Sequence, residues 1–186
     1  MLTIVIPEQE AFNEKLEKFV KAGPYTLKLE HSLLSLQKWE SKHHKYFIDA
    51  EGLSPEEILD YIRCMTLNQV DNNVYDFLTK ENIEEIMEYI KDPMTATFFY
   101  EDPNKPKPIR KKEVITAECI YSSMILLGIP VDIFEKRHLN HLLTLIRVCN
   151  EKQNPDSNKG KASQQDMAKY YSDLNKARKA KLHTRG

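Results

Sequence analysis

Two short stretches in the first thirty residues alternate apolar and polar positions, which is the pattern of half-buried strands. Leu2–Ile6 is rich in β-branched residues and is followed by Pro7, and residues 25–30 alternate in the same way. We predict that these segments are strands and that they pair with each other. The apolar residues between them are spaced as in a helix, although a bulky loop fits them equally: Phe12, Leu16, Phe19 and Val20.

From Ser32 onward the apolar spacing is that of helices. The first predicted helix carries on one side Leu33, Leu34, Leu36, Trp39 and later Tyr46 and Phe47. The run Ser54-Pro55-Glu56-Glu57 predicts a helix start, because Ser accepts first-turn amides and Pro suits the first helical position. This second helix is expected to reach about Gln69. Asp71 and Thr79 are predicted to cap two further helices, the latter ending before Asp92-Pro93.

The densest apolar stripes lie in the second half of the chain. Residues 94–100 are predicted as a short strand, and the proline-containing residues 101–112 as an exposed loop. Two long helices are predicted at residues 112–127, ended by Gly128, and at residues 131–150. Because these two helices carry so many apolar residues, we expect them to form the centre of the core.

Beyond residue 150 the composition changes. The stretch after Asn150 contains no aliphatic residue larger than Ala, so it is predicted to be a flexible linker, and Ser163 begins a segment able to restart a helix. Residues 151–186 carry nine Lys or Arg against four Asp or Glu, whereas residues 1–150 carry eighteen against twenty-four. We therefore expect a mainly α fold: a compact helical body at residues 1–150 with a two-stranded N-terminal element, and a basic C-terminal arm at residues 151–186.

The composition is ordinary for a folded helical protein, with 41% hydrophobic and 30% charged residues. The cysteines are odd in number and widely separated, so we interpret Cys64, Cys119 and Cys149 as reduced core residues. The apolar run at the N-terminus is too short for a secretion signal, and no later run has the length of a membrane span. These features favour the cytoplasm over secretion or membrane insertion.

Candidate chemistry is sparse. Glu135, His138 and His141 are spaced to share one helix face, as metal ligands would be, but a solvated face with one partly buried imidazole fits equally well and no further ligand is marked. The sequence contains no phosphate-binding glycine loop, no GxSxG, HExxH or CxxC motif. We therefore expect neither an enzyme nor a bound metal or cofactor.

The residues best suited to contact a partner protein are aromatic and basic. Trp39 is the single tryptophan and serves either as a core residue or as an interface anchor. The arm offers a small apolar face beside a run of positive charge: Tyr170, Tyr171, Leu174, Arg178, Lys179 and Lys181. Such an arm is expected to order on a partner protein, on a second copy of the chain or on its own acidic body. Nucleic acid is a weaker alternative, because the chain as a whole has a net charge of −1.

Several segments of the chain are distinctive in sequence: residues 27–47 (LKLEHSLLSLQKWESKHHKYF), 59–75 (LDYIRCMTLNQVDNNVY), 92–99 (DPMTATFF), 138–150 (HLNHLLTLIRVCN) and the basic end NKARKAKLHTRG. These segments resemble a family of tailed-phage proteins, some of which are called tail assembly chaperones. The resemblance implies a small helical protein that coats the tape measure protein before the tail tube polymerises around it. It carries no catalytic motif to transfer to this chain.

The resemblance leaves alternatives open. A structural virion component, such as a head–tail connector or a tail-tube accessory protein, is the main competitor, and a host-directed inhibitor or a nucleic-acid-binding protein is more distant. The expected location is the cytoplasm of the infected bacterial host, with the virion as the alternative.

Overall fold

The computed structural model of the chain describes residues 1–13, 18–48, 52–97, 99, 114–153, 168–169, 171–172 and 175–176, and for residues 9, 11–13 and 18–22 it describes the backbone alone. The chain divides into two compact units. The first, here called the body, comprises Met1–Met94 and Glu113–Ile146; the second comprises Thr95–Lys112 and Arg147–Gly186. The sequence placed a single boundary near residue 150, whereas this division also separates residues 95–112 from the body.

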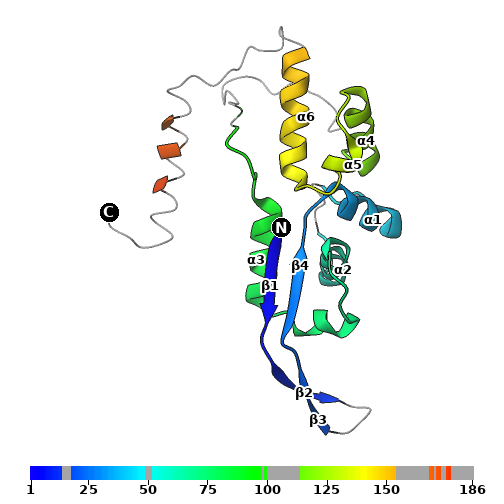
Figure 1. The fold of residues 1–186 in the computed structure, drawn as a ribbon, viewed down its shortest axis with the longest axis vertical. Helices are drawn as coiled ribbons and strands as arrows, with labels where there is room; N and C mark the ends of the chain where they lie inside the picture. The colour runs from blue at the N-terminus through cyan, green and yellow to red at the C-terminus, as the bar shows by residue number, and fades with distance from the viewer. Residues whose placement is uncertain are drawn as a thin grey trace. The chain divides into compact units, whose positions relative to one another are not determined.

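The N-terminal region forms two antiparallel strand pairs (Figure 1). β1 (Leu2–Ile6) pairs with β4 (Tyr25–Leu29), with Ile4 opposite Leu27, which confirms the predicted pair. β2 (Gln9–Asn13) pairs with β3 (Lys18–Ala22). The alternative of a helix between the two predicted strands is therefore wrong. Four bulky residues occur there at helical spacing, but the two neighbouring segments are extended and pair with each other.

The strand pair β1–β4 places alternate side chains in the core. Ile4, Ile6, Leu27 and Leu29 are each at most 1% exposed, whereas Val5 on the other face is 62% exposed. This alternation follows from the two-residue repeat of a strand. In Figure 1, α3 lies along β1 and α2 lies beside β4.

The first helix, α1 (Leu33–His43), begins where the sequence predicted. The Ser32 hydroxyl accepts a hydrogen bond from the Ser35 amide, which satisfies a free donor of the first turn. The helix ends at His44, which adopts a left-handed conformation with φ 52°. Tyr46 and Phe47 therefore follow the helix rather than extending its apolar face.

Two capping boxes start the next long helices. In α2 (Pro55–Met65) the Ser54 hydroxyl accepts from the Glu57 amide, and the Glu57 carboxylate accepts from the Ser54 amide. Thr79 and Asn82 do the same for α3 (Lys80–Lys91), and the short 3-10 helix η1 (Asn72–Phe77) lies between. The starts of α2 and α3 confirm the predictions, although α2 ends four residues earlier than expected. η1 begins after Asp71 as predicted, but the Asp71 side chain makes no capping hydrogen bond.

The main core is built by the strands β1 and β4 with α1, α2, η1 and α3. Trp39, Tyr61, Ile62, Met65 and Ile86 are at most 1% exposed in this cluster. Burying a large apolar side chain contributes roughly 1.5–3 kcal/mol, so this cluster is the main source of stability. The predicted core, centred on the two later helices, is therefore misplaced.

The later helices are shorter than predicted and are interrupted. The first is α4 (Ala117–Leu126), and the predicted helix at residues 131–150 is divided into α5 (Val131–Phe134) and α6 (Leu139–Gln153). Leu139 and Leu142 are buried, but Ile125 and Leu126 are 69% and 84% exposed. α4 thus carries apolar side chains on a solvent-exposed face as well as on its buried face.

In the second unit, the described residues between 94 and 99 form no strand, so that prediction is wrong. The described residues at 168–169, 171–172 and 175–176 are helical, as expected for a helix restarted at Ser163. The predicted loop at residues 101–112 lies outside the described residues. The linker predicted after Asn150 begins too early, because residues 151–153 are the end of α6, and the rest of the linker lies outside the described residues.

Candidate functional site

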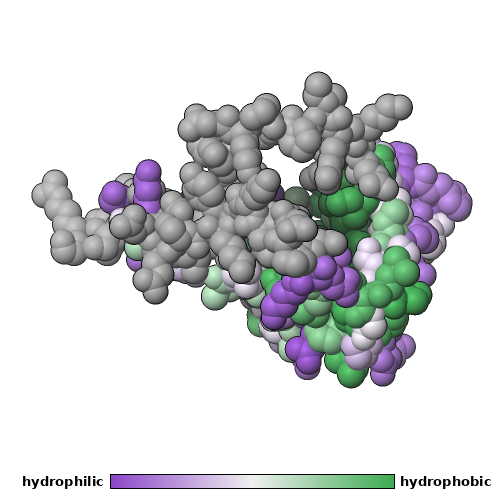
Figure 2. Space-filling model, turned by 90° about the horizontal axis from the view of Figure 1, so that it is seen from above, coloured by the Kyte–Doolittle hydropathy of each residue, from purple (hydrophilic) through white to green (hydrophobic). Residues whose placement is uncertain are grey.

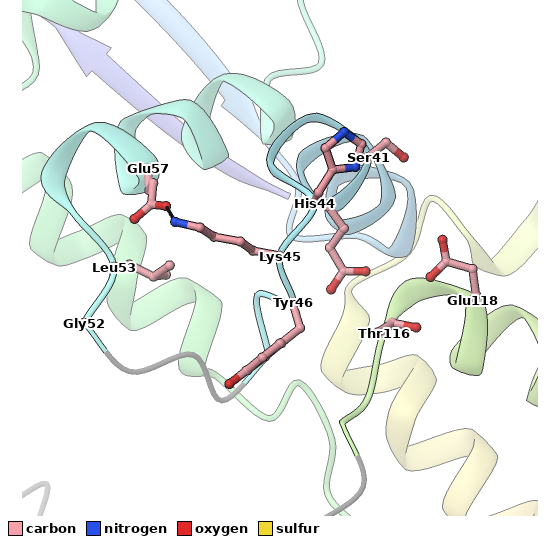
Figure 3. A pocket seen from close by; sticks show the side chains of 10 residues that line it. Ser41, His44, Lys45, Tyr46, Gly52, Leu53, Glu57, Thr116 and Glu118 are labelled. Atoms are coloured by element: carbon pink, nitrogen blue, oxygen red, sulfur yellow. Dashed lines mark hydrogen bonds and ion pairs between the residues drawn. The ribbon is translucent and has the colours of Figure 1, made fainter.

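An open pocket of about 850 Å³ lies where the end of α1, the start of α2 and the start of α4 meet (Figure 3). Most of the residues that line it have polar side chains: Glu40, Ser41, His44, Lys45, Tyr46, Gly52, Leu53, Glu57, Thr116 and Glu118. Because three glutamates and one lysine line it, this pocket is the first candidate for a catalytic or binding site.

Glu40 is the buried acid of this pocket, with 8% of the residue exposed. One carboxylate oxygen accepts from the Ala117 amide at 2.8 Å and the other from the Phe47 amide at 3.2 Å. Burial raises the pKa of this carboxyl, and the two amides oppose that rise without cancelling it. Since Thr116 makes no side-chain capping bond, Glu40 serves as the acceptor for the first turn of α4.

Glu57 is also held by structural bonds. It caps α2 through the Ser54 amide and binds the Lys45 ammonium group, as the dashed line in Figure 3 shows. The hydrogen bond from Lys45 is the largest cause that lowers the pKa of Glu57 to about 2. This carboxylate is charged and already accepts hydrogen bonds from Ser54 and Lys45, so it is poorly suited to act as a general base.

A second polar group surrounds Asp60 on α2. Its carboxylate binds Lys42 at 2.6 Å and His43 at 2.7 Å, and Arg63 lies 3.8 Å away. Burial acts to raise the pKa of Asp60, but the hydrogen bonds from Lys42 and His43 outweigh burial and the pKa is lowered. The cluster joins α1 to α2.

A third polar cluster is enclosed in the body. His31 shares a hydrogen bond of 2.7 Å with the Tyr61 hydroxyl, and the His31 and His138 rings lie 5.2 Å apart. Burial, followed by the nearby His138, lowers the pKa of His31 to about 3. Tyr89 donates to Glu30 at 2.7 Å, and Glu30 also pairs with the N-terminal amine.

The protonation of His138 follows from its partners. Its Nε2 lies 3.1 Å from the Tyr89 carbonyl oxygen, which can only accept, so Nε2 carries the proton. Its Nδ1 accepts from the Asn140 amide at 3.3 Å. Burial lowers the pKa of His138, and the neutral ring already satisfies both nitrogens. This cluster was not predicted, because its members come from segments far apart in the sequence.

The metal-site alternative finds no support in these positions. His138 is buried in the cluster just described, His141 is exposed, and Glu135 accepts a hydrogen bond from Tyr121, whose pKa is raised to about 12 by burial and by this bond. Among the residues that the structure describes, no three His, Cys, Asp or Glu side chains gather as a metal ion would require.

The three cysteines are unpaired, but they are not equally enclosed. Cys64 and Cys149 are half-buried, and burial raises the pKa of the Cys64 thiol. Cys119 is exposed on the first turn of α4, so its assignment to the core is wrong.

The predicted partner-binding residues are only in part described. Trp39 is fully buried, stacks on His43 at 4.4 Å and donates from Nε1 to the Glu57 carbonyl at 3.0 Å. It is a core residue, and its role as an interface anchor is excluded. Tyr171 in the second unit is 38% exposed and its hydroxyl donates to the Ala96 carbonyl. The other side chains proposed for the arm lie outside the described residues: Tyr170, Leu174, Arg178, Lys179 and Lys181.

Large apolar side chains on α4 and α5 are exposed, a feature that the sequence analysis did not identify. Figure 2 shows hydrophobic side chains gathered on the side where α4 and α5 lie in Figure 1. Ile125, Leu126 and Ile133 are between 50% and 84% exposed. Contiguous exposed apolar residues of this kind mark interaction surfaces. No helix among the described residues has the length and apolar content needed to cross a membrane.

The body thus holds its acids, imidazoles and phenols in bonds between its own elements. The resemblance to tailed-phage proteins rests on the quoted segments, of which residues 27–47, 59–75 and 138–150 contribute to α1, α2 and α6. No protein-family model, curated protein or solved structure matches this chain.

Proposed function

We propose that this chain is a non-enzymatic protein of tailed-phage assembly, a tail assembly chaperone whose basic C-terminal arm binds the tape measure protein. The observation that carries the proposal is the state of the arm. Its six described residues between 168 and 176 are helical and all are exposed, including Lys169, Tyr171 and Lys176. A short helix is only marginally stable in water unless one of its faces packs against another surface. We therefore infer that a partner protein covers this segment and stabilises it.

The polar pocket supports binding rather than chemistry. Two of the three acids that line the pocket already have a structural task, because Glu40 caps α4 and Glu57 caps α2. Outside this pocket, Asp60 joins α1 to α2. Among the described residues, no buried side-chain nitrogen or oxygen lacks a hydrogen-bond partner. An acid or base held in this way has little freedom to exchange protons with a substrate.

The resemblance described above supports the phage assignment, and with it we propose the cytoplasm of the infected host as the location of the protein. The charge of the arm adds a physical reason for a protein partner with an acidic face, because nine basic residues stand against four acidic ones. A structural virion component is the second candidate, and the exposed apolar face of α4 favours it, since permanent assemblies cover such surfaces.

Co-purification with the tape measure protein of the same phage tests the proposal. The full chain should retain the tape measure protein, and the double variant Tyr171→Ala, Lys176→Ala should retain at least fivefold less. Lys80→Ala, an exposed lysine on the body, is the matched control and should bind as the unaltered chain does.

Mass spectrometry of purified phage particles separates the two candidates. A chaperone is absent from finished particles, whereas a structural component is present in a fixed copy number. Fixed-stoichiometry incorporation without retention of the tape measure protein would replace the chaperone proposal with the structural one.

A further inference from the structure

A short segment after α3, here called the seat, comprises the described residues 95–97 and 99. These residues form neither a helix nor a strand. The chain bends at Ala96, and the Thr97 amide donates a hydrogen bond of 3.0 Å to the Thr95 hydroxyl. Because no helix or strand uses the backbone of these described residues, their carbonyl oxygens can accept hydrogen bonds from other parts of the chain.

Arg147 of α6 fastens the seat to that helix. The central carbon of its guanidinium group lies 3.8 Å from the centre of the Phe99 ring, which is within the range of a cation–π contact. Arg147 also pairs with Glu151, one turn later in α6, with 3.4 Å between Nε and the carboxylate oxygen. The helix therefore orients the Arg147 side chain while that side chain holds Phe99.

The arm contacts the seat through Tyr171. The Tyr171 hydroxyl donates to the Ala96 carbonyl at 2.9 Å, a bond between residues 75 positions apart in the chain. Tyr171 is 38% exposed, so more than half of its surface is covered. Ala96, Phe99, Arg147 and Tyr171 all belong to the second unit. One series of contacts thus runs from α6 through the seat to the arm.

We propose that the seat holds the arm in the free protein and that a partner of the arm must displace Tyr171 from Ala96. Ala96 and Thr97 are exposed, so a partner can reach the bond between arm and seat. One such hydrogen bond shifts an equilibrium by roughly two- to tenfold, so the docking is readily reversed. Only the undocked fraction binds a partner, which lowers the apparent affinity by that fraction. The displacement step rests on the proposed function, whereas the docking does not.

The length of chain between helix and arm favours docking within one molecule. Fourteen residues separate Gln153, the last residue of α6, from Ala168, the first described residue of the arm. A short linker gives the arm an effective concentration on the order of millimolar at its own seat. A contact this weak is then populated within one chain, while the seat of a second copy would compete only at a similar protein concentration.

Amide hydrogen exchange of the free full chain tests the docking. Amides between positions 168 and 176 should exchange at least roughly threefold more slowly than in a synthetic peptide of residues 163–186. Tyr171→Phe keeps the ring but removes the donor, so it should speed their exchange by roughly two- to tenfold. Tyr46→Phe, at an exposed tyrosine of the body, is the matched control and should have no effect. Equal exchange in chain and peptide, or no effect of Tyr171→Phe, would refute the docking.

Two further exchange measurements identify the seat and the occupant. Arg147→Ala releases Phe99 and should speed the exchange of the arm by a similar factor. Arg137→Ala removes a comparable stack on Phe134, outside the second unit, and should leave the arm unchanged. The protection should also be constant over a roughly hundredfold range of protein concentration. Protection that grows with concentration would place the arm on a second copy and overturn the proposal.

Binding of the tape measure protein tests the displacement. Arg147→Ala leaves every residue of the arm intact, so it should tighten binding by roughly two- to tenfold, whereas Arg137→Ala should not. Unchanged or weaker binding by Arg147→Ala would overturn the displacement step. If the unaltered chain and both variants fail to bind the tape measure protein, the proposed function and the displacement step fail together, while hydrogen exchange still decides whether the arm docks on the seat.

Discussion

The carboxylate of Glu40, near the end of α1, accepts a hydrogen bond of 2.8 Å from the backbone amide of Ala117, 77 residues later in the chain. Ala117 is the first residue of α4. A side chain from one helix thus does for another helix what a capping serine usually does from its own segment. This bond joins α4 to α1.

Substitution of Glu40 should show the value of this bond. Glu40→Gln keeps one acceptor oxygen and should lower the free energy of unfolding by about 1 kcal/mol, whereas Glu40→Ala leaves two amides without an acceptor and should lower it by about 2–4 kcal/mol. Urea unfolding measures both. Glu118→Gln, in the same pocket but exposed, should stay within about 0.5 kcal/mol. Equal losses at positions 40 and 118 would contradict the capping role.

The enclosed histidines should make stability depend on pH. His31 has a pKa near 3 in the folded chain against an ordinary value of 6.5, so between these values the unfolded chain binds more protons. Stability should therefore rise with pH across this window and fall by about 1.4 kcal/mol for each pH unit lost, for His31 alone.

Unfolding in urea at pH values from about 5 to 7 measures this slope. His138, whose pKa burial also lowers, adds to the slope, and Glu40, whose pKa burial raises, opposes it. His31→Phe should flatten the slope, because one buried titrating group is removed. His141→Gln removes an exposed histidine and should leave it unchanged. A slope unaffected by His31→Phe would show that another group causes the pH dependence.

The two later helices should respond unequally to truncation of their leucines. Leu142 is fully buried, so Leu142→Ala should cost about 2–5 kcal/mol. Leu126→Ala should cost less than about 0.5 kcal/mol when measured at a concentration low enough for the monomer. Reversal of this order would show that the exposed face of α4 is covered in the monomer.

Removal of the arm should leave the body stable. A chain ending at residue 154 should differ from the full chain in its free energy of unfolding by less than about 1 kcal/mol, because no described residue of the arm belongs to the main core. Thermal and urea unfolding of the two chains give the comparison. The truncated chain should nevertheless lose the tape measure protein in co-purification. A large loss of stability would instead place the arm within the body's own packing.

The sequence predicted best those elements whose signals are local. Ser54 and Thr79 begin helices because each cap and its partner lie three residues apart, within one turn. The strand pair β1–β4 was also predictable, since the alternation of both strands is visible in the sequence. The spacing of Phe12 and Phe19 wrongly suggested a helix, because bulky residues in a short hairpin can recur at intervals that are also found in a helix.

The sites that the sequence missed depend on distant partners. Nothing in the spacing of Glu40 reveals that it caps a helix 77 residues away, and nothing around His31 reveals His138. The prediction of where the core lies was wrong for a related reason. The many apolar residues of α4 showed that the helix is hydrophobic, but they did not show which of its faces is buried. Burial is decided by tertiary contacts, which a single sequence does not display.

The setting of Trp39 has a consequence for spectroscopy. It is the only tryptophan in the chain, it is fully buried in the body, and it stacks on the His43 ring. Its intrinsic fluorescence is therefore a built-in reporter that registers the folding of the body without a signal from the arm. When a ligand engages the arm alone, the emission spectrum should remain still, so any change in it would signal that the body itself has rearranged.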